Sequence, residues 1–243
     1  MVTKEDVRFV LDSSEGLSAR ARHFLRSEAR RLDFDPGLVG DELRKRIIAV
    51  YGNPNERMVG LLDELQGRYG GLAYRSGFFD ANVAYTPMCE PEDADEELEI
   101  LYVVQTGTSA GASVRADGTV VVGFDQWDVV EFRTLDALLE CDSMFTDVTK
   151  FASVAEVRVS AAGLAGLADY ITAETPFSLQ LVSEACGSHT FWFSGEEGAV
   201  FLCGTWSGMG FPMPPTVKVW SDDDRLADTL RAAYGVLSKE SAK

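Results

Sequence analysis

Serine, cysteine and histidine residues at a few positions could support nucleophilic chemistry. Gly107-Thr-Ser109-Ala-Gly111 matches the G-x-S-x-G pattern of a nucleophile elbow, and Asp125 or Asp128 followed by His189 would complete the chain order Ser, Asp, His. That elbow requires a helix directly after the serine, whereas the sequence soon reaches an Asp117-Gly118 turn. The pattern therefore favours a Gly/Ser turn between strands, and a hydrolase is the least favoured class.

The four cysteines are dispersed and include no CxxC pair: Cys89, Cys141, Cys186 and Cys203. A chain of 243 residues does not depend on disulfides as a small secreted domain does, so we expect reduced thiols. Zinc requires four clustered ligands, or three plus water, and the nearest approach is Cys186-Gly-Ser-His189. We expect no metal, no cofactor and no enzymatic activity; an enzyme would need Ser109, Cys186 or His189 to meet a partner in a pocket.

The excess of negative charge lies downstream of residue 80. Residues 1–80 carry 13 Lys or Arg and 13 Asp or Glu, whereas residues 81–243 carry 9 against 26, which accounts for the net charge of −17. Such a field steers a basic partner and repels nucleic acid. We therefore expect a basic protein partner and no nucleic-acid partner. The alternative is that the acidity confers solubility alone.

The densest acidic run is Glu90-Pro-Glu-Asp-Ala-Asp-Glu-Glu97. It is either a solvated loop or part of an acidic patch with Glu99, Asp125, Asp128 and Glu131 that docks onto the basic face of a nucleic-acid-cleaving protein. Calcium is a weaker alternative, because Pro91 and the missing central glycine break the EF-hand pattern.

A second candidate binding segment is apolar. Thr205-Trp206-Ser207-Gly-Met-Gly210-Phe-Pro-Met-Pro-Pro215 combines aromatic, methionine and proline residues that do not fit regular structure. Segments of this kind form peptide grooves or cover an exposed sheet edge. A regulatory or adaptor protein that binds a peptide here is the alternative function.

Composition predicts a folded protein. Hydrophobic residues make up 46% of the chain, which is enough for a sizeable core. The start MVTKEDVRFV lacks the basic and apolar segments of a signal peptide, and no stretch reaches 18 consecutive apolar residues. We expect a cytoplasmic protein without a membrane partner; its oligomeric state stays open.

Periodicity divides the chain into a helical first third and a strand-rich remainder. We expect helices over residues 18–32, 39–50 and 56–68, since apolar residues recur there at helical spacing. Strands are expected within residues 72–87 and over 98–105, 120–124 and 126–133; their short connections favour an antiparallel meander, which a helix from Thr134 follows. A second unit has helices over 160–172 and 222–237 and strands over 177–183, 190–194, 199–206 and 216–220, while 154–159 fits either type.

The middle of the chain resembles a known family. Leu62-Asp-Glu-Leu-Gln-Gly-Arg-Tyr-Gly-Gly71-Leu72 before a strand, the Asp117-Gly118 turn, and the helix Thr134-Leu-Asp-Ala-Leu-Leu-Glu140 are similar to the SUKH superfamily over about residues 56–150. Its best-known members are bacterial immunity proteins and a fungal cell-wall synthesis regulator. The resemblance implies an α+β fold and a cognate antitoxin that blocks a nuclease- or deaminase-type toxin.

The expected organisation follows from the periodicity and the resemblance together. The fold class is α+β, with N-terminal helices, a central mostly antiparallel sheet with flanking helices, and a C-terminal α+β unit. The expected domains are a helical extension over 1–55 packed on the core, a SUKH-like domain over 56–150, and a subdomain over 151–243. Acids would substitute for phosphates and aromatics would supply anchors. The residues expected to bind the toxin are Glu92, Asp93, Asp95, Glu96, Glu97, Asp125, Trp127 and Asp128.

Overall fold

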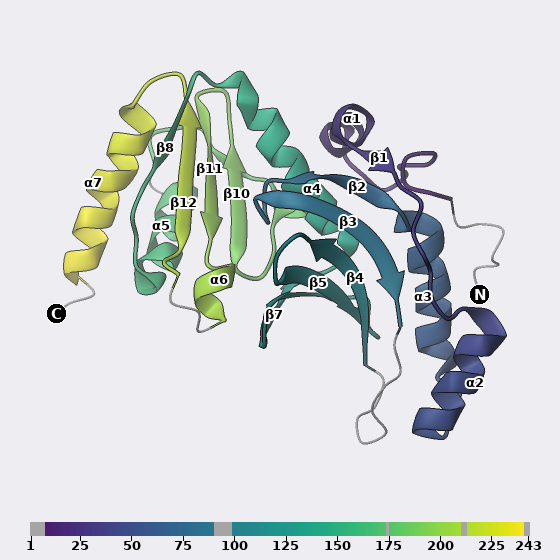
Figure 1. Cartoon of the computed structure of the whole chain (residues 1–243). Coiled ribbons are helices and arrows are strands. Elements are labelled where there is room, and N and C mark those ends of the chain that lie inside the picture. Colours follow the sequence, from purple (N-terminus) through teal and green to yellow (C-terminus); the bar gives the residue numbers. More distant parts are fainter. Residues whose placement is uncertain (1–7, 90–98, 174, 210–212, 241–243) are drawn as a thin grey trace. The chain divides into compact units, whose positions relative to one another are not determined.

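Two antiparallel sheets with packed helices give the chain the α+β fold that the sequence predicts (Figure 1). The computed structural model describes residues 8–89, 99–173, 175–209 and 213–240. The chain divides into two compact units, Met1–Asp136 and Ala137–Lys243. This division falls within helix α4 (Leu135–Asp147), ahead of the boundary expected at residue 150. Asp136, at the start of that helix, is ion-paired with Arg68 of the first unit.

The first unit begins with three helices, α1 (Ala19–Glu28), α2 (Gly40–Tyr51) and α3 (Glu56–Tyr69). The hydroxyl of Ser18 caps α1 by accepting from the N–H of Ala21, and the side chain of Asn55 caps α3 by accepting from the N–H of Met58. Gly52 ends α2 in the left-handed conformation, as its position predicts. Helix α1 is shorter than expected, because Arg30 and Arg31 pair with strand β2 (Leu72–Ser76) instead of continuing the helix.

The sheet of this unit has seven strands that lie in chain order and are all antiparallel, which confirms the expected meander. The strands are β1 (Arg30–Arg31), β2 (Leu72–Ser76), β3 (Ala81–Met88), β4 (Ile100–Thr106), β5 (Ala110–Arg115), β6 (Val120–Phe124) and β7 (Trp127–Phe132). The register shifts within β3 between Tyr85 and Met88 and within β4 between Tyr102 and Val104. A bulge of this kind bends a strand, and the bend of the sheet is visible in Figure 1.

One face of the seven-stranded sheet carries the core of the unit. Tyr85, Val104, Ala112 and Val122 form one cross-strand row of buried side chains on this face. Helix α3 packs here through Tyr69, whose ring lies 6.1 Å from that of Tyr85, and α1 packs through Phe24 on Tyr74. Alternation along each strand turns the intervening side chains to the opposite face.

The Gly70-Gly71 pair lets two chain segments cross closely after α3. The carbonyl of Gly71 accepts from the N–H of Leu32 at 2.7 Å, while its own N–H donates to the carbonyl of Tyr85 at 2.8 Å. Gly71 has φ 82°, and a Cβ atom there would collide with the carbonyl of Leu32. Gly71 of the double glycine, which contributes to the family resemblance, is therefore required for the chain at Leu32 to lie this close to it.

The second unit contains a five-stranded antiparallel sheet in the order β8-β12-β11-β10-β9. Its strands are β8 (Ser153–Glu156), β9 (Gln180–Leu181), β10 (Thr190–Ser194), β11 (Gly198–Cys203) and β12 (Thr216–Ser221). Its helices are α4 (Leu135–Asp147), α5 (Ala161–Ala173), the single turn α6 (Thr205–Gly208) and α7 (Arg225–Glu240), with 3-10 turns at Val148–Lys150 and Ser183–Ala185.

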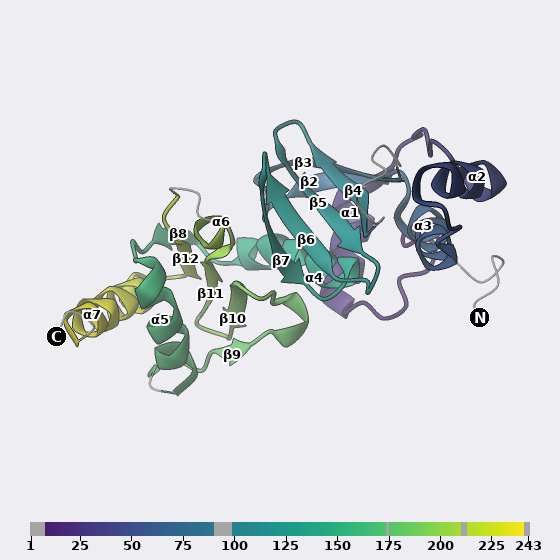
Figure 2. The same cartoon turned by 90° about the horizontal axis from the view of Figure 1, so that it is seen from below.

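Both faces of this second sheet are covered. Helices α5 and α7 lie side by side on one face (Figures 1 and 2), over a core that includes Phe193, Val200 and Val219. On the other face, the ring of Phe145 from α4 lies 4.9 Å from both Trp192 and Phe201. The aromatic residues of β10 and β11 are therefore core residues.

The structure corrects two of the expected strands. Residues 177–183 were expected to form one strand, yet only Gln180 and Leu181 pair, because β9 meets β10 at just two positions. The strand expected over 199–206 ends at Cys203, and Thr205–Gly208 forms α6, so the first part of the apolar segment is helical rather than irregular. The ambiguous stretch at 154–159 overlaps β8, which ends at Glu156.

Candidate functional site

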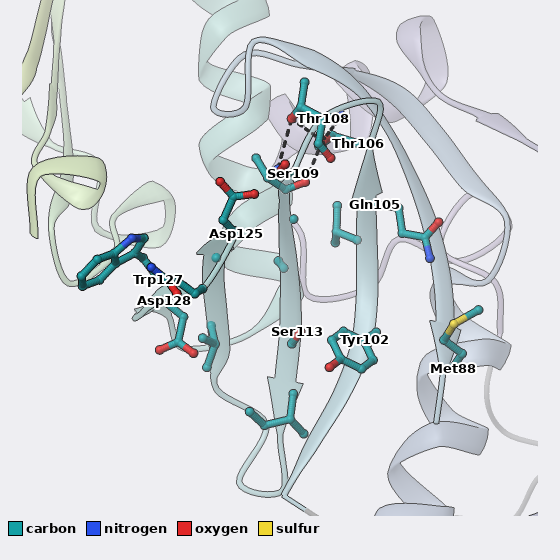
Figure 3. A pocket seen from close by; sticks show the side chains of 18 residues that line it. Met88, Tyr102, Gln105, Thr106, Thr108, Ser109, Ser113, Asp125, Trp127 and Asp128 are labelled. Atoms are coloured by element: carbon teal, nitrogen blue, oxygen red, sulfur yellow. Dashed lines mark hydrogen bonds between the residues drawn. The ribbon is translucent and has the colours of Figure 1, made fainter. Parts of the chain in front are cut away.

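A hollow of about 700 Å³ lies on the open face of the seven-stranded sheet, opposite α1 and α3. Figure 3 shows the side chains around it: Tyr102 and Ser113 come from neighbouring strands, Met88 lies on one side, and Asp125, Trp127 and Asp128 lie on the other. The hollow lies entirely within the first unit, over strands β3 to β7.

The register explains why this face is hollow. Gly111 of β5 pairs with Gly123 of β6, so two adjacent strands place no side chain at the middle of the face. Gln105 of β4 pairs with Gly111, and Asp128 of β7 pairs with Gly123, which puts polar side chains on either side of the glycines. A single cross-strand row therefore forms a low floor between two raised sides.

A second row brings aromatic and apolar surface to the same face. Met88, Tyr102 and Ser113 are paired in turn across β3, β4 and β5, and Ser113 pairs with Val121 of β6. Tyr102 is 57% exposed, although it is a large side chain in the middle of a sheet. An exposed aromatic beside a hollow is the kind of residue that anchors binding partners.

The β6–β7 hairpin forms the acidic end of the hollow. Asp125 lies in the tight turn with φ 52°, and its N–H donates to the carbonyl of Ser109 at 3.3 Å. Trp127 is 45% exposed and projects at the outer strand beside Asp128 (Figure 3). Among the described residues that line the hollow, Asp125 and Asp128 are the charged ones, and both are exposed acids. The hollow therefore presents negative charge only.

The Thr106–Ala110 turn closes one side of the hollow. The hydroxyl of Thr106 donates to the carbonyl of Ala110 at 2.6 Å and accepts from the N–H of Thr108 at 3.1 Å. Ser109 sits in this turn and is followed directly by strand β5 rather than by a helix. The G-x-S-x-G pattern therefore lacks the geometry of a nucleophile elbow, as the sequence analysis expects.

Three of the residues predicted to bind a partner meet at this site, namely Asp125, Trp127 and Asp128. The other five, Glu92, Asp93, Asp95, Glu96 and Glu97, lie outside the described residues. Glu99 is exposed, but the inclusion of Glu131 in the acidic surface is wrong, because only 1% of that residue is exposed.

Among the described residues of the strand region, several other acids are held in ion pairs or in a turn. Asp136 is paired with Arg68 at 2.9 Å, and Asp147 is paired with Lys150 at 3.0 Å. Asp117 holds its own turn: hydrogen bonds from the hydroxyl and the N–H of Thr119 lower the pKa of its carboxyl group. Among the described residues that line the hollow, the negative charge is therefore carried by Asp125 and Asp128 at the β6–β7 end.

Tyr102, Gln105, Gly111 and Gly123 line the hollow but are not among the site residues predicted from the sequence. Each lies in a strand on the open face, and counting the alternation outward from the buried row of Val104, Ala112 and Val122 assigns Gln105, Gly111 and Gly123 to that face. The bulge between Tyr102 and Val104 interrupts that count, since it puts Tyr102 and Gln105 three positions apart on one face.

The surroundings of the Cys186 thiol disfavour its reactive thiolate form. The thiol of Cys186 donates to the carbonyl of Val182 at 3.2 Å, and burial raises its pKa, which disfavours the thiolate. The carbonyl of His189 accepts from the N–H of Gly204 at 2.8 Å. No cluster of three or more metal-ligating side chains occurs among the described residues.

The apolar segment after β11 is only partly described. Trp206 lies in α6, Met209 is buried and Met213 is 46% exposed, while residues 210–212 lie outside the described parts of the chain.

Within the described parts of the chain, no helix has the length and apolar character needed to cross a membrane.

Comparisons with protein-family models, with curated proteins and with solved structures find no match to this chain. The site is therefore interpreted from its own geometry.

Proposed function

We propose that this protein binds a basic segment of a partner protein over the hollow of the seven-stranded sheet. One observation carries the proposal: a hollow of about 700 Å³ with exposed Tyr102 beside it has Asp125 and Asp128 as its charged lining residues. Aromatic anchors supply contact area, and a negative rim selects a cationic partner and speeds its approach.

The SUKH resemblance gives the proposal a specific form. A basic nuclease- or deaminase-type toxin would present to the hollow the cationic surface with which it holds phosphates, and the bound protein would cover that surface. The net charge of −17 supports this form, since it favours association with a basic partner.

The test is a selection of displayed random nonapeptides on the full chain. We expect enrichment in Lys and Arg, and an association rate that falls steeply as ionic strength rises. The variant Asp125→Asn/Asp128→Asn keeps the side-chain shapes and should weaken binding of the selected peptides about tenfold. Tyr102→Ser should also weaken it about tenfold, through loss of the aromatic anchor.

The matched control is Glu196→Gln/Glu197→Gln, which removes the same charge from exposed residues of the second unit. We expect this control to bind as the unchanged protein does. Selected peptides without basic enrichment, or equal loss in both double variants, would rule out the proposed site. If the partner is a toxin, this protein should rescue cells that express a toxin domain encoded beside its gene. The variant Asp125→Asn/Asp128→Asn should fail to rescue them.

A further inference from the structure

A second hollow continues the first one across the sheet. It has a volume of about 460 Å³ and is lined by residues of α1 and of strands β1 to β4. The two hollows share Gln105 and Thr106 as lining residues, and both lie within the first unit. Together they reach from β1 to β7.

A single cross-strand row runs the length of both hollows. Its members are paired in turn, one from each of the seven strands: Arg30, Ala73, Ala84, Gln105, Gly111, Gly123 and Asp128. Six inter-strand spacings of about 4.8 Å make this row roughly 29 Å long. An extended polypeptide advances about 3.3 Å per residue, so a segment of roughly nine residues spans the row.

The two hollows together form one groove that runs from β1 to β7. Its two ends carry opposite charge. Arg30 and Arg75 line the β1–β2 end together with Glu28, which leaves a net positive charge there. Arg75 is paired with Asp80 at the surface, where both side chains are mostly exposed. Ion pairs between exposed side chains are weak, so a partner's carboxylate can replace Asp80. The β6–β7 end carries Asp125 and Asp128.

The middle of the groove suits a polypeptide backbone. Ala84, Gly111 and Gly123 contribute little or no side chain, so a ligand main chain can approach the sheet closely. Gln105 is exposed where the two hollows meet, and its side-chain amide offers both a donor and an acceptor to a peptide group.

We infer that the groove holds an extended segment of about nine residues, with a basic side chain at Asp125 and Asp128 and an acidic side chain or C-terminal carboxylate at Arg30 and Arg75. This inference rests on the proposed function, because the basic end is the same site. It adds that the partner's recognised segment carries both charges at a fixed separation and lies across the strands. A nucleic acid does not fit, since its uniform negative charge opposes the acidic end.

The test compares displayed nonapeptides selected on the full chain with those selected on Arg30→Glu/Arg75→Glu. On the unchanged protein we expect Lys or Arg near one end and an acidic group seven or eight positions away, in the same order in all selected peptides. On the variant we expect the basic preference to remain and the acidic preference to disappear. Arg26→Glu/Arg57→Glu changes the charge equally at exposed residues that do not line the groove, and should select the same peptides as the unchanged protein.

The outcomes separate the two proposals. Basic enrichment without an acidic group at a fixed distance overturns the bipolar groove and leaves the proposed function standing. Absence of basic enrichment overturns both. Circular dichroism and thermal unfolding of each variant establish that it is folded, so a loss of selection is not a loss of structure.

Discussion

Gly111 of β5 and Gly123 of β6 are directly paired, but the space above the two residues differs. A Cβ atom at Gly111 would lie 2.7 Å from the carbonyl oxygen of Val104, which is backbone and cannot move aside easily. A Cβ atom at Gly123 would lie 3.4 Å from the carbonyl oxygen of Trp127 and 3.8 Å from the Cβ of Asp128. The floor of the groove is therefore fixed by a close backbone approach at one glycine and is adaptable at the other.

The first prediction is that Gly111→Ala and Gly123→Ala differ in stability. Gly111→Ala should lower the free energy of unfolding by about 1–3 kcal/mol, because the added methyl group forces the backbone apart. Gly123→Ala should stay within about 1 kcal/mol of the unchanged protein, since its contacts are close to ordinary and alanine restricts the unfolded chain. Urea unfolding of both variants measures the difference. Equal destabilisation would contradict the described register.

A second prediction concerns Tyr69, which joins α3 to the start of α4. Its hydroxyl donates to the carboxylate of Asp136 at 2.8 Å, and Arg68 pairs with the same carboxylate. Burial raises the pKa of Tyr69 far above its ordinary value, and the negative charge of Asp136 adds to the rise. Because the folded state favours the neutral phenol, this contribution to stability is fully present below about pH 10 and is lost as the pH rises further.

Tyr69→Phe should therefore have two effects. At pH 7 the free energy of unfolding should fall by about 1.5–3 kcal/mol, through loss of a hydrogen bond to a charged acceptor. Between roughly pH 10 and pH 11 its stability should decline less steeply than that of the unchanged protein, because the buried phenol no longer titrates. Urea unfolding across this range checks both. As a control at pH 7, Tyr102→Phe at an exposed tyrosine of the same unit should leave the free energy of unfolding within about 0.5 kcal/mol of the unchanged protein.

The helices and the meander were predictable because their signals are local. Apolar spacing located α2 and α3, which the structure confirms to within one residue at each end. Strand β5 was not identified, because Ala110-Gly-Ala-Ser113 contains small residues without an apolar alternation. The same small residues make the hollow, so the feature that creates the site is also the one that hides it from sequence patterns.

The long-range features of the site required the register. Asp125, Trp127 and Asp128 are close in sequence and were predicted together, whereas Tyr102 and Gln105 reach the site only through strand pairing and a bulge. Likewise, nothing in the sequence around Arg30 indicates that it occupies the same cross-strand row as Asp128. The polarity of the groove is therefore a property of the fold rather than of any one motif.

A third prediction concerns the reactivity of the four cysteine thiols in the folded protein. Cys89, Cys141 and Cys203 are buried, and Cys186 is partly buried with a raised pKa. The folded protein should react with a disulfide reagent such as DTNB at pH 8 at least about tenfold more slowly than the urea-unfolded chain, since thiolate and access are both reduced. Cys186→Ser should fold normally. Rapid reaction of Cys186 near pH 7 would instead indicate a lowered pKa and would reopen the enzyme hypothesis.

The last prediction tests how α4 stabilises the second unit. The ring of Phe145 lies 4.9 Å from Trp192 and from Phe201, and Trp192 also stacks on Trp220 at 5.3 Å. Phe145→Ala should lower the free energy of unfolding by about 2–4 kcal/mol, because it leaves a cavity among three aromatic rings. The loss is smaller than for a fully buried phenylalanine, since Phe145 is only partly buried.

The matched variant Phe145→Leu retains apolar volume, and its loss should stay below about 1.5 kcal/mol. Near-ultraviolet circular dichroism of Trp192 and Trp220 should change more in Phe145→Ala than in Phe145→Leu, since the edge-to-face contact with Trp192 orders both indoles. Equal stability and equal spectra for the two variants would show that α4 does not pack on this sheet through Phe145. In that case the conclusion that α4 covers this face of the second sheet would be wrong. The contrast drawn with the open face of the first sheet would be wrong as well.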